Sequence, residues 1–353
     1  MGEQSKRMGN WAWIAGVVLL VLLTACGGNK DTSNGGNAGA GNSEAANGTE
    51  AGQAEEQTPS ASLRISRESG PSSGLLFIAD AKGFLDEQGL DYEIVSFANG
   101  AEAVDALQAR QIQVAFGAAD TFPIRGNDSG LLALTAVSQQ PSAVSIVAAS
   151  DVNAPEDLKG RAIGVVPNTV SQFVLENMYL VDGGLGTDDY TATATGPAEM
   201  IALMARGDID AFALWDPFPA QAVEALGDKV KVIATSGELG IPNTTFLLVN
   251  KSSMEDEAYV RAYQELLRGL QQAQAYLEAN PEESATIIGE ATQLTQEDVL
   301  ARFEDIRLEV FMDESAVGEI ENYNQILTST GTVEQAADLE VMVDQEFLGT
   351  VDQ

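Results

Sequence analysis

Short apolar runs alternate with amphipathic segments along most of this chain. Apolar runs bounded by Gly, Pro, Asn or Ser predict strands, and apolar residues spaced three and four apart predict helices. The predicted strands cover 63–66, 92–97, 112–116, 131–138, 144–149, 161–166, 209–214, 230–234 and 245–249. The predicted helices cover 75–88, 101–110, 170–181, 197–206 and 257–277, with shorter ones in 281–311 and the tail. This alternation is typical of an α/β fold with mostly parallel sheets.

One helix–turn–strand unit occurs twice at a constant spacing of 96 residues. Residues 100–120 align without gaps on 196–216, and eight of 21 positions are identical, among them Asp120 and Asp216. Ligands of open α/β sheets bind beyond the carboxyl ends of the strands. Since each aspartate follows a predicted strand, we expect the two tips to face each other across a cleft. The alternative is that any αβ unit rich in Ala and Leu aligns as well, because the repeat is single and short.

The N-terminus has the pattern of an export signal. Lys6 and Arg7 precede an apolar run over 11–23, which is shorter than the roughly 20 residues of a membrane-spanning helix. The run ends in Leu23-Thr24-Ala25-Cys26, which resembles the bacterial lipoprotein processing box, where the cysteine is lipidated before cleavage. The resemblance implies a signal peptide over 1–25 and a lipid anchor on Cys26. An ordinary export signal with an incidental cysteine is the alternative.

A polar segment separates this signal from the first predicted strand. Residues 27–60 contain no aromatic residue and no Val, Ile or Leu, so they cannot bury enough surface to offset their ordering entropy. We therefore expect residues 26–62 to form a flexible tether that spans about 30 Å. The folded part is expected to work outside the cell membrane, anchored to its outer face.

Composition removes several classes of function. The 353 residues include no histidine, one cysteine, 18 Lys+Arg and 53 Asp+Glu, for a net charge of −35. Without histidine there is no imidazole base and no histidine metal ligand, and a lone cysteine makes neither an internal disulfide nor a zinc site. The acidic excess repels nucleic acid. A binding protein, or an enzyme that uses carboxylates alone, remains; no cofactor and no metal are predicted.

Several motifs resemble one family in order along residues 63–290. They are Ala79-Asp80-Ala81-Lys82-Gly83-Phe84, Pro155-Glu156-Asp157-Leu158-Lys159-Gly160-Arg161, Arg206-Gly207-Asp208-Ile209-Asp210-Ala211 and Trp215-Asp216-Pro217-Phe218. The set resembles extracytoplasmic solute-binding lipoproteins of ABC importers, of the sulfonate/taurine/nitrate and thiamine-precursor type.

The resemblance implies a two-lobe periplasmic-binding-protein-like fold (type II), in which two α/β domains are joined by a two-strand hinge. Lobe one is expected over 63–150 plus 246–353, and lobe two over 151–245. It also implies a monomer that is not an enzyme and that closes on a small solute. Its partners are the ABC permease and the ATPase of that permease.

Three predicted strand ends carry small polar residues before a helix, at 72–74, 117–121 and 167–171. Helix N-termini suit an anionic head such as a sulfonate, although each polar residue could instead be a simple N-cap. The residues that the resemblance places near the ligand are Ser72, Ser73, Ala118, Ala119, Ser138, Gln139, Asn168 and Thr169.

Trp215 and Asp216 are the sharpest local feature, because Pro217 suits the first helical turn that follows. Trp215 is expected to form an apolar wall, and Asp216 to hold an ammonium or accept hydrogen bonds from the solute. The alternative is a core tryptophan and a helix cap. Arg67 and Arg125 are candidate partners for an anion, although both are more typical of surface positions.

An acidic pair Asp120/Asp216 with few bases nearby favours a zwitterion, a nitrogen heterocycle or an uncharged solute over nitrate. An aliphatic sulfonate or taurine-like solute is the first expectation. A thiamine-precursor pyrimidine, a riboflavin-like heterocycle and nitrate stay open. So do a secreted hydrolase that uses two carboxylates about 5–10 Å apart and a surface sensor without transport.

Overall fold

The computed structural model describes residues 59–351. The predicted signal peptide, Cys26 and the predicted tether up to residue 58 lie outside these residues. Where the tether was expected to continue to Ser62, the Ala61 N–H donates to the Ala258 carbonyl at 3.0 Å. The chain is therefore already held to helix α9 (Glu257–Ala279) at that point. Within the described residues, no helix combines the length and apolarity that crossing a membrane requires.

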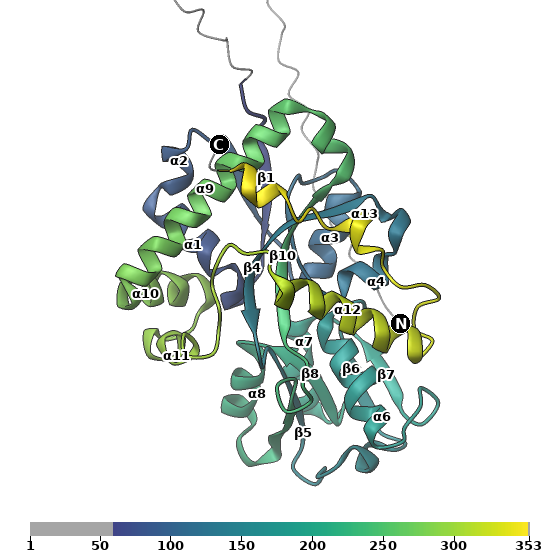
Figure 1. Cartoon of the computed structure of the whole chain (residues 1–353). Coiled ribbons are helices and arrows are strands. Elements are labelled where there is room, and N and C mark those ends of the chain that lie inside the picture. Colours follow the sequence, from purple (N-terminus) through teal and green to yellow (C-terminus); the bar gives the residue numbers. More distant parts are fainter. Residues whose placement is uncertain (1–58, 352–353) are drawn as a thin grey trace, which may run out of the picture. The chain divides into compact units, whose positions relative to one another are not determined.

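The strands of residues 59–351 form three sheets (Figure 1). The first sheet contains β1 (Leu63–Arg67) and β2 (Tyr92–Ser96). The second has the order β3 (Ala115–Ala118), β10 (Asn243–Asn250), β4 (Leu131–Gln140). The third has the order β7 (Thr191–Ala194), β6 (Ala162–Val165), β8 (Ala211–Trp215), β5 (Val144–Ala149), β9 (Val230–Thr235). Each predicted strand overlaps one of these, and β7 is the strand that the pattern missed.

The sheets are mixed rather than mostly parallel. Strand β1 runs parallel to β2, and β6 runs parallel to β7 and β8. Every antiparallel pair involves β5 or β10. The chain enters a new sheet on each of these two strands through a short connection. Because no crossover helix precedes them, nothing forces them to run parallel to their neighbours.

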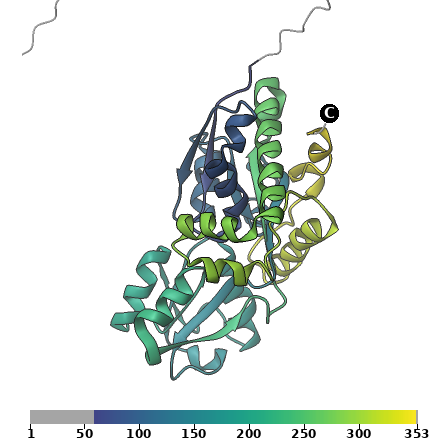
Figure 2. The ribbon, with the colours of Figure 1, turned by 90° about the vertical axis from the view of Figure 1, so that its left-hand side faces the viewer.

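Helices α1 (Gly74–Lys82), α2 (Phe84–Glu87), α9 and α10 (Pro281–Thr292) pack together beside the first two sheets (Figure 2). The buried residues of α9 recur three or four positions apart, as an amphipathic helix requires. The single helix predicted over 75–88 is two helices. Gly83, at a left-handed φ of 74°, ends α1 and begins α2.

The five-stranded sheet buries both of its faces. Phe212 and Leu214 of β8 pack in a cluster with α7 (Pro197–Arg206) and α8 (Phe218–Leu226). The alternate residues Ala211 and Ala213 pack on the other face, where one continuous helical segment lies. That segment consists of α5 (Val170–Gln172), a π-helical stretch (Phe173–Tyr179) and α6 (Leu180–Asp182).

The remaining helices are α3 (Gly100–Gln108), α4 (Thr121–Arg125), α11 (Gln296–Arg302), α12 (Glu314–Ser329) and α13 (Leu339–Met342). Helix α12 reaches the five-stranded part of the molecule. The rings of Phe173 and Tyr323 lie 4.4 Å apart between centroids, and both residues belong to one continuous apolar cluster.

The chain passes between the second and the third sheet twice, over residues 141–143 and 236–242. Strand β5, which the predicted boundaries place in lobe one, pairs with β8 and β9 in the five-stranded sheet. The predicted boundary at residue 246 falls inside β10, which begins at Asn243 and, among the described strands, pairs only with β3 and β4.

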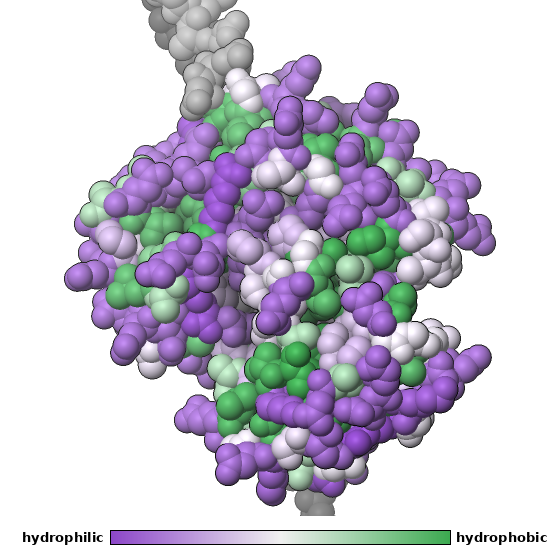
Figure 3. Space-filling model, turned by 60° about the horizontal axis from the view of Figure 1, so that its bottom comes forward, coloured by the Kyte–Doolittle hydropathy of each residue, from purple (hydrophilic) through white to green (hydrophobic). Residues whose placement is uncertain are grey.

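On the surface, hydrophilic residues cover much of the face in Figure 3, interrupted by apolar patches.

Candidate ligand-binding site

A pocket lies where strand ends from the second and the third sheet meet. It encloses about 600 Å³ outside the protein atoms, including its open mouth. Its lining residues are Glu68, Gly70, Pro71, Ser72, Gly100, Ala101, Ala118, Asp120, Thr121, Gln140, Ala143, Asn168, Thr169, Val170, Trp215, Asp216, Asn243 and Thr245. The carboxyl ends of β1, β3, β6 and β8 all contribute, as expected for ligand sites of α/β sheets.

Seven of the predicted site residues line this pocket: Ser72, Ala118, Asp120, Asn168, Thr169, Trp215 and Asp216. The two tips of the sequence repeat therefore open into the same space. The duplicated helix and strand are α3 with β3 and α7 with β8, so the repeat is structural.

Four predicted residues do not line it. Ser73 is buried, and its hydroxyl accepts the Glu68 N–H. Ala119 is fully buried, and its N–H donates a hydrogen bond to the Thr244 carbonyl. Ser138 and Gln139 lie within β4, which continues to Gln140, and it is Gln140 that reaches the pocket.

Glu68 is the acidic residue of the lining that the sequence did not single out. Its Oε2 accepts a hydrogen bond from the Ser72 hydroxyl at 3.1 Å. Burial raises the pKa of this carboxyl to about 7, although the bond from Ser72 opposes the shift. The available signal was its place directly after a strand and four residues before Ser72.

Asp120 is 1% exposed, and its Oδ2 has no hydrogen-bond partner among the described residues. Burial raises the pKa of its carboxyl to about 7, against the effect of its own backbone N–H. The nearby Glu319 and Glu68 carboxylates add to the increase, and Arg125 reduces it. Asp120 is thus a buried acceptor at the pocket wall that other protein groups leave incompletely satisfied.

Asp216 is already paired. The Arg302 Nε donates to Asp216 Oδ2 at 2.7 Å, and both side chains are about a quarter to a third exposed, at 25% and 32%. Arg302 ends α11, so this ion pair joins a helix of the C-terminal region to the end of β8. The contacts therefore favour a structural partner for Asp216 over the ammonium-binding role expected from the sequence.

The two arginines proposed as anion partners lie elsewhere. Arg67 donates from Nε to the Ser96 hydroxyl and lies over the Phe77 ring. Arg125 pairs with Asp105 at 2.6 Å. Among the described residues that line the pocket there is no Lys and no Arg. Nor do the described residues contain a cluster of His, Cys, Asp or Glu that could hold a metal ion.

Residues 71–284 match the family model described as NMT1/THI5 like, which is well over half of the chain. The chain belongs to the NMT1/THI5-like family. This membership agrees with the expected resemblance.

Two curated relatives and one solved structure are similar to this NMT1/THI5-like chain. A protein of Brucella abortus (strain 2308) that carries the name of a binding protein is 27% identical over 60% of this chain. The chain covers 65% of that relative, just under two thirds of its length. An Escherichia coli (strain K12) protein named for aliphatic sulfonate binding is 26% identical over 68% of this chain and 74% of its own length. The alkanesulfonate-binding protein of Xanthomonas axonopodis pv. citri, solved with MOPS, has a TM-score of 0.68 at 20% identity. That match covers 82% of this chain and 99% of the other, and it shows the periplasmic-binding-protein fold.

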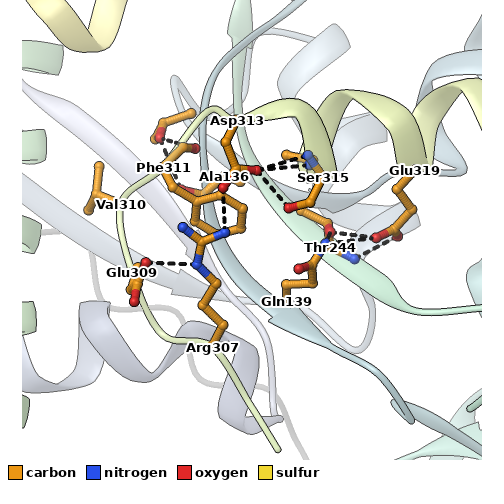
Figure 4. A network of polar contacts seen from close by, with 12 residues as sticks. Ala136, Gln139, Thr244, Arg307, Glu309, Val310, Phe311, Asp313, Ser315 and Glu319 are labelled. Atoms are coloured by element: carbon orange, nitrogen blue, oxygen red, sulfur yellow. Dashed lines mark hydrogen bonds and ion pairs between the residues drawn. The ribbon is translucent and has the colours of Figure 1, made fainter.

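A polar network lies behind the pocket of this NMT1/THI5-like chain (Figure 4). Glu319 of α12 accepts hydrogen bonds from the Thr244 N–H at 2.7 Å and from the Thr244 hydroxyl at 2.5 Å. Gln139 donates to the same hydroxyl, which explains why its side chain is turned away from the pocket. The network fixes the start of β10, and Asn243 and Thr245 of that segment line the pocket.

Arg307 holds the neighbouring segment in place. Its guanidinium lies 3.6 Å from the Phe311 ring centroid and pairs with Glu309 and Asp313, each at 2.7 Å (Figure 4). Burial opposes ionisation of Asp313, but hydrogen bonds from Ser315 and Arg307 prevail and lower its pKa to about 2. Asp313 caps α12, so these contacts position the helix that carries Glu319.

Gly100 makes room for Glu68, and this provides a test of the site. A Cβ at Gly100 would lie 2.5 Å from Glu68 Oε1 and 3.3 Å from the Phe116 carbonyl oxygen. We expect Gly100→Ala to displace the Glu68 carboxyl and to destabilise the fold by about 1–3 kcal/mol, as measured by urea unfolding. The control is Gly196→Ala at the equivalent repeat position, where a Cβ meets nothing within 4 Å. Equal losses in both variants would show that Glu68 does not depend on Gly100.

Proposed function

We propose that this chain is the extracytoplasmic solute-binding protein of an ABC importer. It captures a small organic solute, an aliphatic sulfonate or taurine-like compound, between two lobes and delivers it to the permease and its ATPase. The observation that carries the proposal is the pocket, whose lining comes from the strand ends of both parts of the fold. Closure of such lobes around a solute by hinge motion is the general mechanism.

The proposed lobes follow the sheets. Lobe one contains the first two sheets, and lobe two contains the five-stranded sheet. The hinge is proposed over residues 141–143 and 236–242, close to the boundaries expected from the sequence and displaced by β5. A monomer is proposed, as the resemblance to this family implies.

Two observations support the proposed solute class: the name of a relative and the residues that line the pocket. The Escherichia coli relative is named for aliphatic sulfonates. In the pocket, Trp215 offers an apolar wall beside the polar residues Asn168, Thr169 and Thr245. The described lining residues include no Lys and no Arg, which disfavours nitrate and, within the proposed class, favours a taurine-like zwitterion over a sulfonate without an amine. A thiamine-precursor pyrimidine or a riboflavin-like heterocycle fits the same lining and is the alternative solute.

A binding protein, not an enzyme, is proposed, without a cofactor. A carboxylate-based hydrolase needs one carboxyl with a raised pKa and a second that stays ionised and free to act. Here the pKa of both Glu68 and Asp120 is raised, and Asp216 is engaged by Arg302. This arrangement favours binding over hydrolysis.

Native mass spectrometry of the purified protein tests the proposal. We expect a co-purified small solute that is released unchanged on denaturation. Calorimetry with the identified compound should then give one site per chain. Conversion of that compound into a product during incubation would contradict the receptor role.

The proposed anchor gives a separate prediction. We expect Cys26→Ser to incorporate no fatty acid and to keep its signal peptide, because no acyl chain can be attached without the thiol and lipidation precedes cleavage. Metabolic labelling with a fatty acid and the intact mass of the purified protein measure this. The control is Ser43→Ala in the predicted tether, which should be labelled and cleaved. Incorporation of the fatty acid into the Cys26→Ser variant would contradict lipid anchoring through Cys26.

A further inference from the structure

The charges of the pocket lining are all acidic: Glu68, Asp120 and Asp216. Arg302 neutralises Asp216 through the 2.7 Å ion pair. Glu68 and Asp120 have no such partner within residues 59–351. Ser72 supplies one neutral hydrogen bond to Glu68, and the Arg125 guanidinium, whose charge acts on Asp120, is paired with Asp105.

The unsatisfied polar atoms of the lining are of one kind. Asp120 Oδ2 and Asn243 Oδ1 are buried, and neither has a hydrogen-bond partner among the described residues. Both residues are more than nine-tenths buried, at 1% and 8% exposed. Both atoms are acceptors, and leaving a buried acceptor unpaired costs free energy that a donor on a ligand would recover.

A sulfonate or nitrate group brings only acceptor oxygens, so it cannot satisfy these atoms. A basic nitrogen can, because an ammonium or amidinium head offers several N–H donors and a positive charge. The groups facing Asp120 agree with this: Glu319 of α12 and Glu68 after β1 are acidic, and Arg125 on its own helix is held by Asp105.

We infer that Glu68, Asp120 and Asn243 form a seat for a solute head that carries a basic nitrogen. The pocket then selects zwitterionic or cationic solutes over simple anions, and Asp216 is not the ammonium acceptor. This inference rests on the proposed function and assigns the substrate class of that same pocket.

Calorimetry with matched probes on the full chain at pH 8 tests the seat. The sulfonate set is taurine (2-aminoethanesulfonate), isethionate and ethanesulfonate, which share the anionic end and differ in the head. The set without a sulfonate is benzamidine and benzyl alcohol. We expect the nitrogen-bearing member of a set to bind at least about tenfold more tightly than its partners, since a charge-assisted hydrogen bond is worth that much or more.

Substitutions show which residues cause the tighter binding of the nitrogen-bearing probe. Asp120→Asn and Glu68→Gln should each reduce the preference for the amine to less than about threefold. Glu224→Gln, at an exposed residue of α8 outside the lining, is the control and should retain it. Thermal unfolding first confirms that each variant is folded, and two seat variants keep the test valid if one is not.

Each outcome decides between the two proposals. Equal binding of taurine and ethanesulfonate, or an unchanged preference in both seat variants, overturns the seat and leaves the solute-binding function standing. Loss of the preference in Asp216→Asn alone also overturns it. Binding of none of the five probes to the folded protein overturns the seat, and the mass spectrometry of a co-purified solute then decides the solute-binding function separately.

Discussion

Raising the pH from about 4 to about 8 is expected to destabilise the unliganded protein by about 4 kcal/mol relative to its Asp120→Asn variant. Burial raises the pKa of Asp120 from its ordinary 3.8 to about 7 in the folded state. The folded protein therefore holds a proton that the unfolded chain releases. This contribution to stability is complete below about pH 4 and is lost as the pH rises through about 7.

Urea unfolding of wild type and Asp120→Asn across this pH range gives the free energy of unfolding at each pH. The effect is the difference between the two slopes of that free energy against pH. The comparison isolates Asp120 from carboxyls with the opposite behaviour, such as Asp313, whose pKa is lowered to about 2. Asp313→Asn is the control and should leave the slope between pH 5 and pH 8 unchanged. Parallel curves for wild type and Asp120→Asn would show that the Asp120 carboxyl is solvated rather than buried.

Phe173→Ala is expected to destabilise the protein by about 3–5 kcal/mol, as truncation of a buried phenylalanine generally does. Phe173 is 2% exposed and lies against Tyr323, at 4.4 Å between ring centroids. Because Phe173 belongs to the helical segment on the five-stranded sheet and Tyr323 to α12, the pair spans the two proposed lobes. We therefore also expect a weaker affinity for solute and a larger radius of gyration by X-ray scattering.

Phe122→Ala is the matched control. Phe122 is fully buried against Phe246 with an edge-on ring at 5.2 Å, and both of these residues belong to the second sheet and its helix α4. A similar loss of stability is expected, with no change in the radius of gyration. An unchanged radius in Phe173→Ala would assign the Phe173–Tyr323 pair to general core packing rather than to holding the lobes together.

The sequence predicted most elements because their apolar faces are regular. Helix α7 occupies the predicted residues, and Gly196 and Gly207 flank it. Strand β7 was missed because its Thr and Ala residues are mostly exposed at a sheet edge and carry no large apolar side chain. The mixed direction of the strands could not be predicted either, since it depends on which sheet β5 and β10 enter.

Site residues were predictable from the sequence where a polar side chain directly follows a predicted strand. Asp120 stood out because the repeat places it opposite Asp216. Arg302 did not, because its partner lies 86 residues away in sequence and only folding brings α11 to the end of β8. Ser138 was misplaced because β4 runs two residues further than its apolar pattern, so the pocket receives Gln140 instead.

The structural repeat bears on the orientation in which a solute binds. The tips of two copies of a helix–strand unit open into one pocket, so equal tips would offer the same group to both ends of a solute. Helix α11 lies outside the repeat, and its Arg302 quenches the charge of one tip only. The two tips of the duplicated unit therefore differ in charge. If the pocket binds solute as proposed, we expect a molecule with unlike ends to bind in a single orientation.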